Sequence, residues 1–142
     1  MSVKLKHAYA AGLFDGEGCV MFFQRTSGQW QTELTLSNCD RLALEFLVDL
    51  FGGHFRVAAK LVGTRRHPIG IWNISGDSAT KAAKAMLPYS ILKKEQLTLF
   101  LEGRATVKGR GRPLLAPVVK QRKKIAQRIR FLKRPQWQGA GS

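Results

Sequence analysis

The sequence predicts an α+β fold in which helices back one face of a four-stranded antiparallel sheet. Four short segments either alternate apolar and polar residues or are rich in β-branched and aromatic residues, as strands are. The segments that separate them place apolar residues at helical spacing. With 142 residues, 44% of them hydrophobic, the chain is long enough to bury one sizeable core.

The first half of the chain supplies two helices and two strands. Residues 4–17 are expected to form a helix, and strands are expected at 19–25 and 30–38, joined by the turn TSGQ. Asp40 is a suitable N-cap for a second helix with Leu and Phe at helical spacing, and a Gly-Gly pair at 52–53 ends it.

The second half begins with strands at 54–62 and 69–75, joined by the basic turn GTRRHP. Asp77 or Ser78 is expected to cap a third helix that runs to Leu87, since Pro88 cannot continue it. A fourth helix is expected from about Lys93 to Gly103. The predicted order is therefore α-β-β-α-β-β-α, with the fourth helix following the third directly.

A basic C-terminal helical tail follows this body. We expect a domain at 1–103 and a tail at 104–142, with a linker at 109–113 (GRGRP) and a helix at about 117–133. One face of that helix carries Val118, Ile125, Ile129 and Leu132.

The charge of the chain is the strongest signal in its composition. The net charge is +15, with 24 Lys and Arg against 9 Asp and Glu, and no acid follows Glu102. A polyanion, most often a nucleic acid, is the expected partner. No membrane span or signal peptide is expected. Cys19 and Cys39 are expected to be free thiols, and the three histidines lack the spacing of metal ligands.

The stretch AAGLFDGEG at residues 10–18 combines glycines with two of the few acids. On a helix, Ala8, Gly12 and Gly16 lie along one face with almost no side chain, which favours close approach of another backbone, such as a second copy of this helix. Asp15 and Glu17 lie at the C-terminal end, where the helix dipole disfavours negative charge. Carboxylate and carbonyl oxygens suit Mg²⁺. A plain helix end with two solvated acids remains the alternative.

Alternation along the strands predicts which side chains leave the core. We expect Leu34, Leu36, Phe55, Val57, Leu61, Trp72 and Ile74 to point inward, and Tyr9, Leu13 and Phe14 of the first helix to join them. The outward positions carry hydrogen-bonding side chains of the kind that read base edges in a major groove, although a hydrated sheet face has the same pattern. Candidate nucleic-acid contacts are Arg25, Gln31, Glu33, Thr35, Arg56, Lys60, Arg65, Arg66 and Asn73.

Three segments of the sequence resemble one known family. AAGLFDGEG at 10–18 resembles the nonamer of the LAGLIDADG homing endonucleases, with alanine at position 10 where a larger aliphatic residue is usual. LVDLFGG at 47–53 resembles the end of the family's second helix, and LPYSILKKEQ at 87–96 resembles its Pro-aromatic-x-x-x-Leu-Lys-x-x-Gln segment. With one nonamer, the chain resembles the single-motif, homodimeric type.

The resemblance implies roles for individual residues. Glu17 would bind a catalytic Mg²⁺ together with the carbonyl of Gly16, and Asp15 would be a structural acid. Lys93 would lie near the scissile phosphate and the attacking water. Asn38, with Ser37 as second choice, would orient that water, although Asn38 is equally suited to cap the next helix.

The implied activity is metal-dependent, site-specific hydrolysis of double-stranded DNA by a homodimer whose interface includes Ala8, Gly12 and Gly16. Strands of about eight residues span about 27 Å, which predicts a pseudo-palindromic site of roughly 16 to 22 base pairs. The alternatives are an RNA-binding intron splicing factor, or maturase, and a DNA-binding protein without activity on the same fold. Either way we expect an intracellular protein located with its DNA, in a bacterial or phage-infected cytoplasm or an organelle.

Overall fold

The computed structural model describes residues 1–107 and 115–134. Its elements are α1 (Val3–Glu17), β1 (Gly18–Gln24), β2 (Trp30–Asn38), α2 (Arg41–Phe51), β3 (His54–Val62), β4 (Arg65–Ser75), α3 (Gly76–Met86), the 3-10 turn η1 (Leu87–Tyr89), α4 (Lys94–Ala105) and α5 (Ala116–Leu132). The predicted linker at 109–113 lies outside the described residues. None of the helices in these two ranges is long and apolar enough to cross a bilayer.

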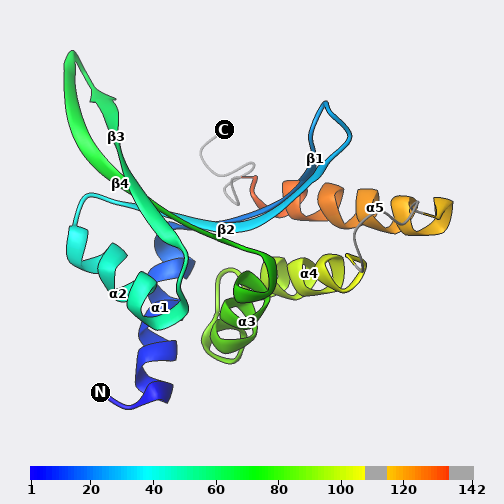
Figure 1. Ribbon diagram of the computed structural model, residues 1–142, viewed down its shortest axis with the longest axis horizontal. Coiled ribbons are helices and arrows are strands. Elements are labelled where there is room, and N and C mark those ends of the chain that lie inside the picture. The colour runs from blue at the N-terminus through cyan, green and yellow to red at the C-terminus, as the bar shows by residue number, and fades with distance from the viewer. Residues whose placement is uncertain (108–114, 135–142) are drawn as a thin grey trace, which may run out of the picture.

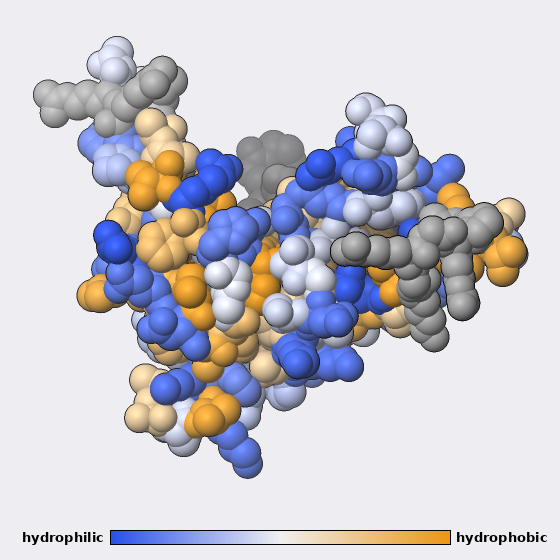
Figure 2. All heavy atoms as spheres, viewed as in Figure 1, coloured by the Kyte–Doolittle hydropathy of each residue, from blue (hydrophilic) through white to orange (hydrophobic). Residues whose placement is uncertain are grey.

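The strands form one antiparallel sheet in the order β1-β2-β4-β3, so the predicted fold class is confirmed. The hairpins β1–β2 and β3–β4 lie side by side, joined through β2 and β4. Figure 1 shows the helices gathered below the sheet, while the tips of the two hairpins rise at opposite ends. The surface is hollowed between these tips (Figure 2), so the molecule has the shape of a saddle.

The core lies between the sheet and the helices. Val20, Leu34 and Ile74 are neighbours across three strands, and all are buried. Phe14 of α1 and Phe100 of α4 are fully buried on the same side. The indole of Trp72 is also buried and donates to the carbonyl of Gly52 at 2.9 Å, which fixes the end of α2 against β4.

The basic helix α5 is part of this packed structure. Ile125 and Ile129, both on the predicted apolar face, are buried, and α5 contacts α4 and β1. Helix α4 itself lies close to β1, because a Cβ atom added at Gly103 would overlap the ring of Phe22. The division of the chain at residue 103 remains a prediction, but the helix beyond it contributes to the core.

Two predicted boundaries are wrong by a few residues. Strand β4 begins at Arg65 instead of residue 69, because the backbone pairing with β3 continues to the pair Val62–Arg65 and leaves only residues 63–64 as the turn. Helix α3 begins at Gly76, with Ser75 at the N-cap position, so neither Asp77 nor Ser78 is its cap. The Asp40 cap of α2 is confirmed, since its carboxylate accepts from the amide of Leu42 at 2.9 Å.

Two side chains predicted in the core are exposed. Val57 is 71% exposed, because the β3–β4 hairpin extends beyond the helices that cover the rest of the sheet (Figure 1). Tyr9 is 57% exposed, because it lies on the flank of α1, where its ring contacts Phe46 edge-on at 5.2 Å between centroids.

Candidate active site and nucleic-acid interface

Asp15, the first acid of the opening stretch, is buried at the end of α1. Its carboxylate accepts a hydrogen bond from the Ser90 hydroxyl at 2.5 Å. It also accepts from the backbone amides of Ile91 at 2.7 Å, Leu92 at 3.0 Å and Lys93 at 3.2 Å. One carboxylate therefore ties the last turn of α1 to the segment that leads into α4.

Burial and these hydrogen bonds act on the pKa of Asp15 in opposite directions. Burial alone would raise this pKa, since it disfavours the charged carboxylate. The four donors stabilise the charge and outweigh burial, so the pKa of Asp15 lies below its usual value. Asp15 is therefore a charged structural residue whose oxygens are already occupied.

Lys93 strengthens the same connection. Its Nζ donates to the backbone carbonyl of Asp15 at 2.6 Å, one of the carbonyls that the end of α1 leaves without a helical partner. Burial lowers the pKa of Lys93, the carboxylate of Asp15 and the nearby Cys19 oppose this, and the positive charge of Lys133 adds to the lowering. Lys93 is thus held close to the C-terminal end of α1, and its expected place near the scissile phosphate stays a prediction.

Glu17, in contrast to Asp15, is exposed at the last residue of α1. The side-chain amide of Asn38 donates to its carboxylate, and the Asn38 carbonyl accepts from the amide of Asp40 at 2.6 Å. Asn38 therefore contacts Glu17 and also orders the entry into α2, while its expected role in orienting the attacking water stays a prediction. Ser37, the second choice, is exposed on the neighbouring position of β2.

The residues at this end of α1 could supply some of the ligands of a divalent cation, but not a complete site. Glu17 offers an exposed carboxylate, and the carbonyl of Gly16 belongs to the last helical turn, where carbonyls lack amide partners. These are hard oxygen ligands of the type that Mg²⁺ prefers. Within residues 1–107 and 115–134, however, no three acids, histidines or cysteines gather in one place. The remaining ligands would have to come from water, a phosphate or a second copy of the chain.

The sheet face turned away from the helices carries several of the candidate nucleic-acid contacts in register. Thr35 of β2 is paired with Asn73 of β4, and Glu33 with Ser75. Arg25 donates to the side chain of Gln31 at 2.8 Å, and Gln31 donates to Glu33. Arg25, Gln31 and Glu33 therefore form a connected polar row, in which Arg25 is exposed and the two β2 side chains are partly exposed.

The β3–β4 hairpin carries the remaining candidates. Arg56 is exposed on β3 and is paired with Ile71 of β4. By backbone register, Lys60 is opposite His67, and Arg65 and Arg66 lie at the start of β4 rather than in a turn. These cationic residues therefore follow one another along the hairpin that rises at one end of the saddle (Figure 1).

Within the described part of the chain, the glycines of α1 have open space beside them. Gly12 and Gly16 are exposed, and a Cβ atom added at either would meet nothing within 4 Å. Leu5 and Tyr9, which precede them on the same face, are 60% and 57% exposed. Ala8 is half-buried beside them. One side of α1 is therefore an uncovered, largely apolar strip.

Two contributors to this region were not predicted. Ser90 gave no signal, because its partner Asp15 lies 75 residues away in the sequence. Lys133, at the end of α5, donates to the carbonyl of Val20 on β1 at 2.5 Å, whereas the sequence presents it only as one residue of a basic tail. The apolar face of α5 predicts that this helix packs on an apolar surface, but it does not identify which surface.

No protein-family model and no curated protein matches the chain. Among solved structures, homing endonuclease I-CvuI in complex with its target matches with a TM-score of 0.73 and 22% identity, over 94% of this chain and 85% of that one. A second I-CvuI complex, in the presence of Mg with its DNA not cleaved, has a TM-score of 0.59 and 21% identity, over 87% and 96%. The archaeal intron-encoded homing endonuclease I-Vdi141I, complexed with DNA, has a TM-score of 0.73 and 15% identity, over 94% and 87%. The protein therefore has the homing-endonuclease fold, with its LAGLIDADG-like stretch at the end of α1.

Proposed function

We propose that the protein is a site-specific double-strand DNA endonuclease that acts as a homodimer by Mg²⁺-dependent hydrolysis at a long pseudo-palindromic site. The observation that carries this proposal is the pair formed by Glu17 and Asn38. An exposed carboxylate is held by an amide at the end of a helix whose glycine face is uncovered. The similar solved structures, which are homing endonucleases in complexes with DNA, support the choice of substrate.

A second copy of the chain would complete the site. Gly12 and Gly16 allow close approach of two α1 helices, because neither position carries a side chain that would hold them apart. Packing two α1 helices by their glycine faces brings the two Glu17 carboxylates to one place. A two-fold dimer presents the same sheet surface twice, so its target should be a pseudo-palindrome.

Each residue then has a distinct part in the reaction. Glu17, with the carbonyl of Gly16, would hold Mg²⁺, which supplies charge stabilisation and a more acidic bound water when present. Asn38 keeps the Glu17 carboxylate in one orientation. Lys93 places a positive charge beside the same helix end, where it can stabilise negative charge that develops on the phosphate. Asp15 has no free oxygen for this chemistry and serves to position Lys93.

The sheet face supplies sequence recognition in this proposal. The row of Arg25, Gln31 and Glu33 presents hydrogen-bonding groups that are already ordered by one another, which lowers the entropy lost on binding. Lys60, Arg65, Arg66 and Arg56 on the β3–β4 hairpin add positive charge at the far end, suited to bases or phosphates. Such a protein would work inside the cell, where its DNA target is.

The test is cleavage of a plasmid library that carries random sites, with Mg²⁺ and the full chain. Wild type should cut a small subset of plasmids, and Glu17→Gln should bind the selected site but leave it intact. Asp49→Asn is the matched control, because it removes an exposed acid from α2, away from Glu17, and should cut normally.

Two outcomes would contradict the proposal. A wild type that binds DNA specifically without nicking it would be a DNA-binding protein that lacks activity. A wild type that binds structured RNA more tightly than DNA of equal charge would be the splicing factor, which the acid-free basic helix α5 also suits.

A further inference from the structure

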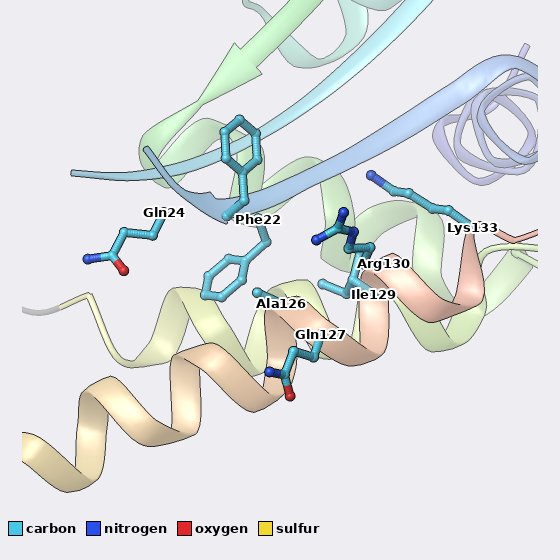
Figure 3. A pocket seen from close by; sticks show the side chains of 8 residues that line it. Phe22, Gln24, Ala126, Gln127, Ile129, Arg130 and Lys133 are labelled. Atoms are coloured by element: carbon cyan, nitrogen blue, oxygen red, sulfur yellow. The ribbon is translucent and has the colours of Figure 1, made fainter. Parts of the chain in front are cut away.

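Lys133 brings the end of α5 next to the candidate active site. Its Nζ lies 2.5 Å from the carbonyl oxygen of Val20 and 3.4 Å from the sulfur of Cys19. Cys19 is two residues after Glu17 in the chain. Figure 3 shows that Arg130 and Lys133 both leave α5 on the side that faces β1.

Lys133 and Lys93 line the same hollow. It has a volume of about 290 Å³ and is bordered by Gly18, Cys19, Lys93, Gln96, Leu132 and Lys133. At ~30 Å³ for each water molecule, this space is large enough for a hydrated anionic group. The two lysines come from segments that are far apart in the sequence, and the hollow opens between the start of β1 and the end of α5.

The charges around the hollow favour an anion. Among the described residues, the ion pairs join Arg41 to Glu45, Arg104 to Asp77 and Arg128 to Glu95, so neither lysine is in one of them. The carboxylate of Asp15, which faces Lys93, is already held by Ser90 and three backbone amides. Two neighbouring positive charges repel each other unless a negative group lies between them.

The side chain of Gln96 is a second indication that the hollow binds a ligand or water. Its side chain is only 8% exposed, and its buried Oε1 has no hydrogen-bond partner among the described residues. A buried polar atom without a partner is costly, and a water molecule or a bound polar group normally satisfies it. An ammonium group or a water molecule held by a bound anion would meet that need.

Packing fixes the position of Lys133. Ile125 and Ile129 are buried against α4 and β1, and Leu132, the residue before Lys133, is half-buried in the wall of the hollow. The hydrogen bond to Val20 would protect the free edge of β1, but this alone does not explain why Lys93 and Gln96, with its unsatisfied Oε1, line the same hollow. A preordered cation costs less entropy on binding than a mobile one.

We propose that Lys133, in the hollow that it shares with Lys93, binds the phosphodiester phosphate of the DNA backbone next to the scissile phosphate, so that α5 supplies part of the active site. This inference rests on the proposed endonuclease function. It changes the expected role of the basic helix from general attraction of DNA to positioning of the bond that is cut.

The first experiment compares Lys133→Gln with Lys124→Gln, which removes an equal charge from an exposed position of the same helix. Single-turnover cleavage is measured on the selected site at saturating protein, with affinity measured separately in Ca²⁺. Lys133→Gln should slow the cleavage step by about tenfold or more, as expected when one charged donor to the substrate is lost. Lys124→Gln should change only the affinity and its salt dependence.

The second experiment replaces single phosphates around the cut with uncharged methylphosphonates. One position should slow wild type and leave Lys133→Gln without further loss, because the interaction is already gone. A Lys133→Gln protein that cuts at the wild-type rate would overturn the inference. The inference would also be overturned if, at every phosphate, the methylphosphonate and Lys133→Gln slowed cleavage independently. Such additive effects would mean that Lys133 only stabilises the edge of β1. If wild type cuts no DNA at all, the proposed function fails first, which separates the two conclusions.

Discussion

The carboxylate of Asp15 is the polar group whose removal we expect to destabilise the fold most. Asp15→Asn isolates this group, because the amide has almost the same shape and size. One carboxylate oxygen accepts from Ser90 and the amide of Lys93, and the other accepts from the amides of Ile91 and Leu92. An asparagine keeps one oxygen, so in either orientation its NH₂ group faces two donors.

The magnitude follows from the two hydrogen bonds that must be lost. Hydrogen bonds to a charged group contribute about 1.5–3 kcal/mol each, so their loss costs roughly 3–6 kcal/mol before any relaxation. Since the amide group can shift toward solvent, we expect about 3 kcal/mol of the free energy of unfolding. For a chain of this length, that corresponds to a decrease in Tm of roughly 10 °C.

The assay is thermal and urea unfolding of the free protein, with Glu17→Gln as the matched control. Both variants change a carboxylate to an amide at the end of α1, but Glu17 is exposed and its Asn38 contact is open to water. Glu17→Gln should melt within about 2 °C of wild type, as surface substitutions usually do. An Asp15→Asn protein that melts as high as Glu17→Gln would show that the four contacts contribute little to stability.

Unfolding at low pH provides a second measure of how much the Asp15 carboxylate contributes to stability. The pKa of Asp15 is lowered from 3.8 in the folded chain, so its contribution to stability is fully present above that value. The contribution is lost as the pH falls through the folded pKa, because the protonated group binds its donors weakly. The difference in unfolding free energy between wild type and Asp15→Asn should therefore shrink below about pH 4. A difference that stays constant into acid would contradict this explanation.

Three substitutions and one deletion test the remaining interfaces. Gly12→Leu should abolish the proposed dimer in sedimentation without lowering the Tm of the monomer. A Cβ atom at this position meets nothing within 4 Å, and glycine is less favourable in a helix than alanine by about 1 kcal/mol. Deleting residues 116–142 should lower the Tm as well as the DNA affinity, because it uncovers the surface that Ile125 and Ile129 bury; an unchanged Tm would mean that α5 only binds DNA. Gly103→Ala should lower the free energy of unfolding, measured in urea, by about 1–3 kcal/mol, because the added methyl group overlaps the ring of Phe22. Arg56→Ala should relax preference at one or two positions of each half-site by about 1–3 kcal/mol per base contact, measured by selection from a site library.

The strands, helices and most of the core could be predicted because they depend on local periodicity. Leu34 and Leu36 are buried on one side of β2, and Glu33 and Thr35 lie between them on the other, as the alternation of the sequence indicates. The contact between Glu17 and Asn38 was also within reach, since two adjacent strands bring the end of α1 beside the end of β2. The predicted burial of Val57 is wrong because alternation identifies a face of the sheet but does not show how far the helices cover that face.

The partners of Asp15 and Lys133 could not be predicted, because they depend on how distant segments pack. The sequence pattern of an acid at a helix end is the same whether its carboxylate is solvated or bound by amides from elsewhere in the chain. Residues 90–93 carry no pattern that points to Asp15, although three of their four hydrogen bonds to its carboxylate come from the backbone. A lysine in a basic tail is likewise the same residue whether it faces water or β1.

The hydrogen bonds of Asp15 and Lys133 also have a consequence for the order in which the protein folds. The Asp15 contacts close a loop of 75 to 78 residues, and the contact of Lys133 with Val20 spans 113. Contacts of such long sequence separation form late, because the chain entropy of closing the loop must be overcome first. On the ribosome, the wall of the hollow contributed by Lys133 is absent until α5 has been synthesised. A nascent chain would therefore gain the lysine of the proposed phosphate site only after α5 has left the ribosome and packed on β1.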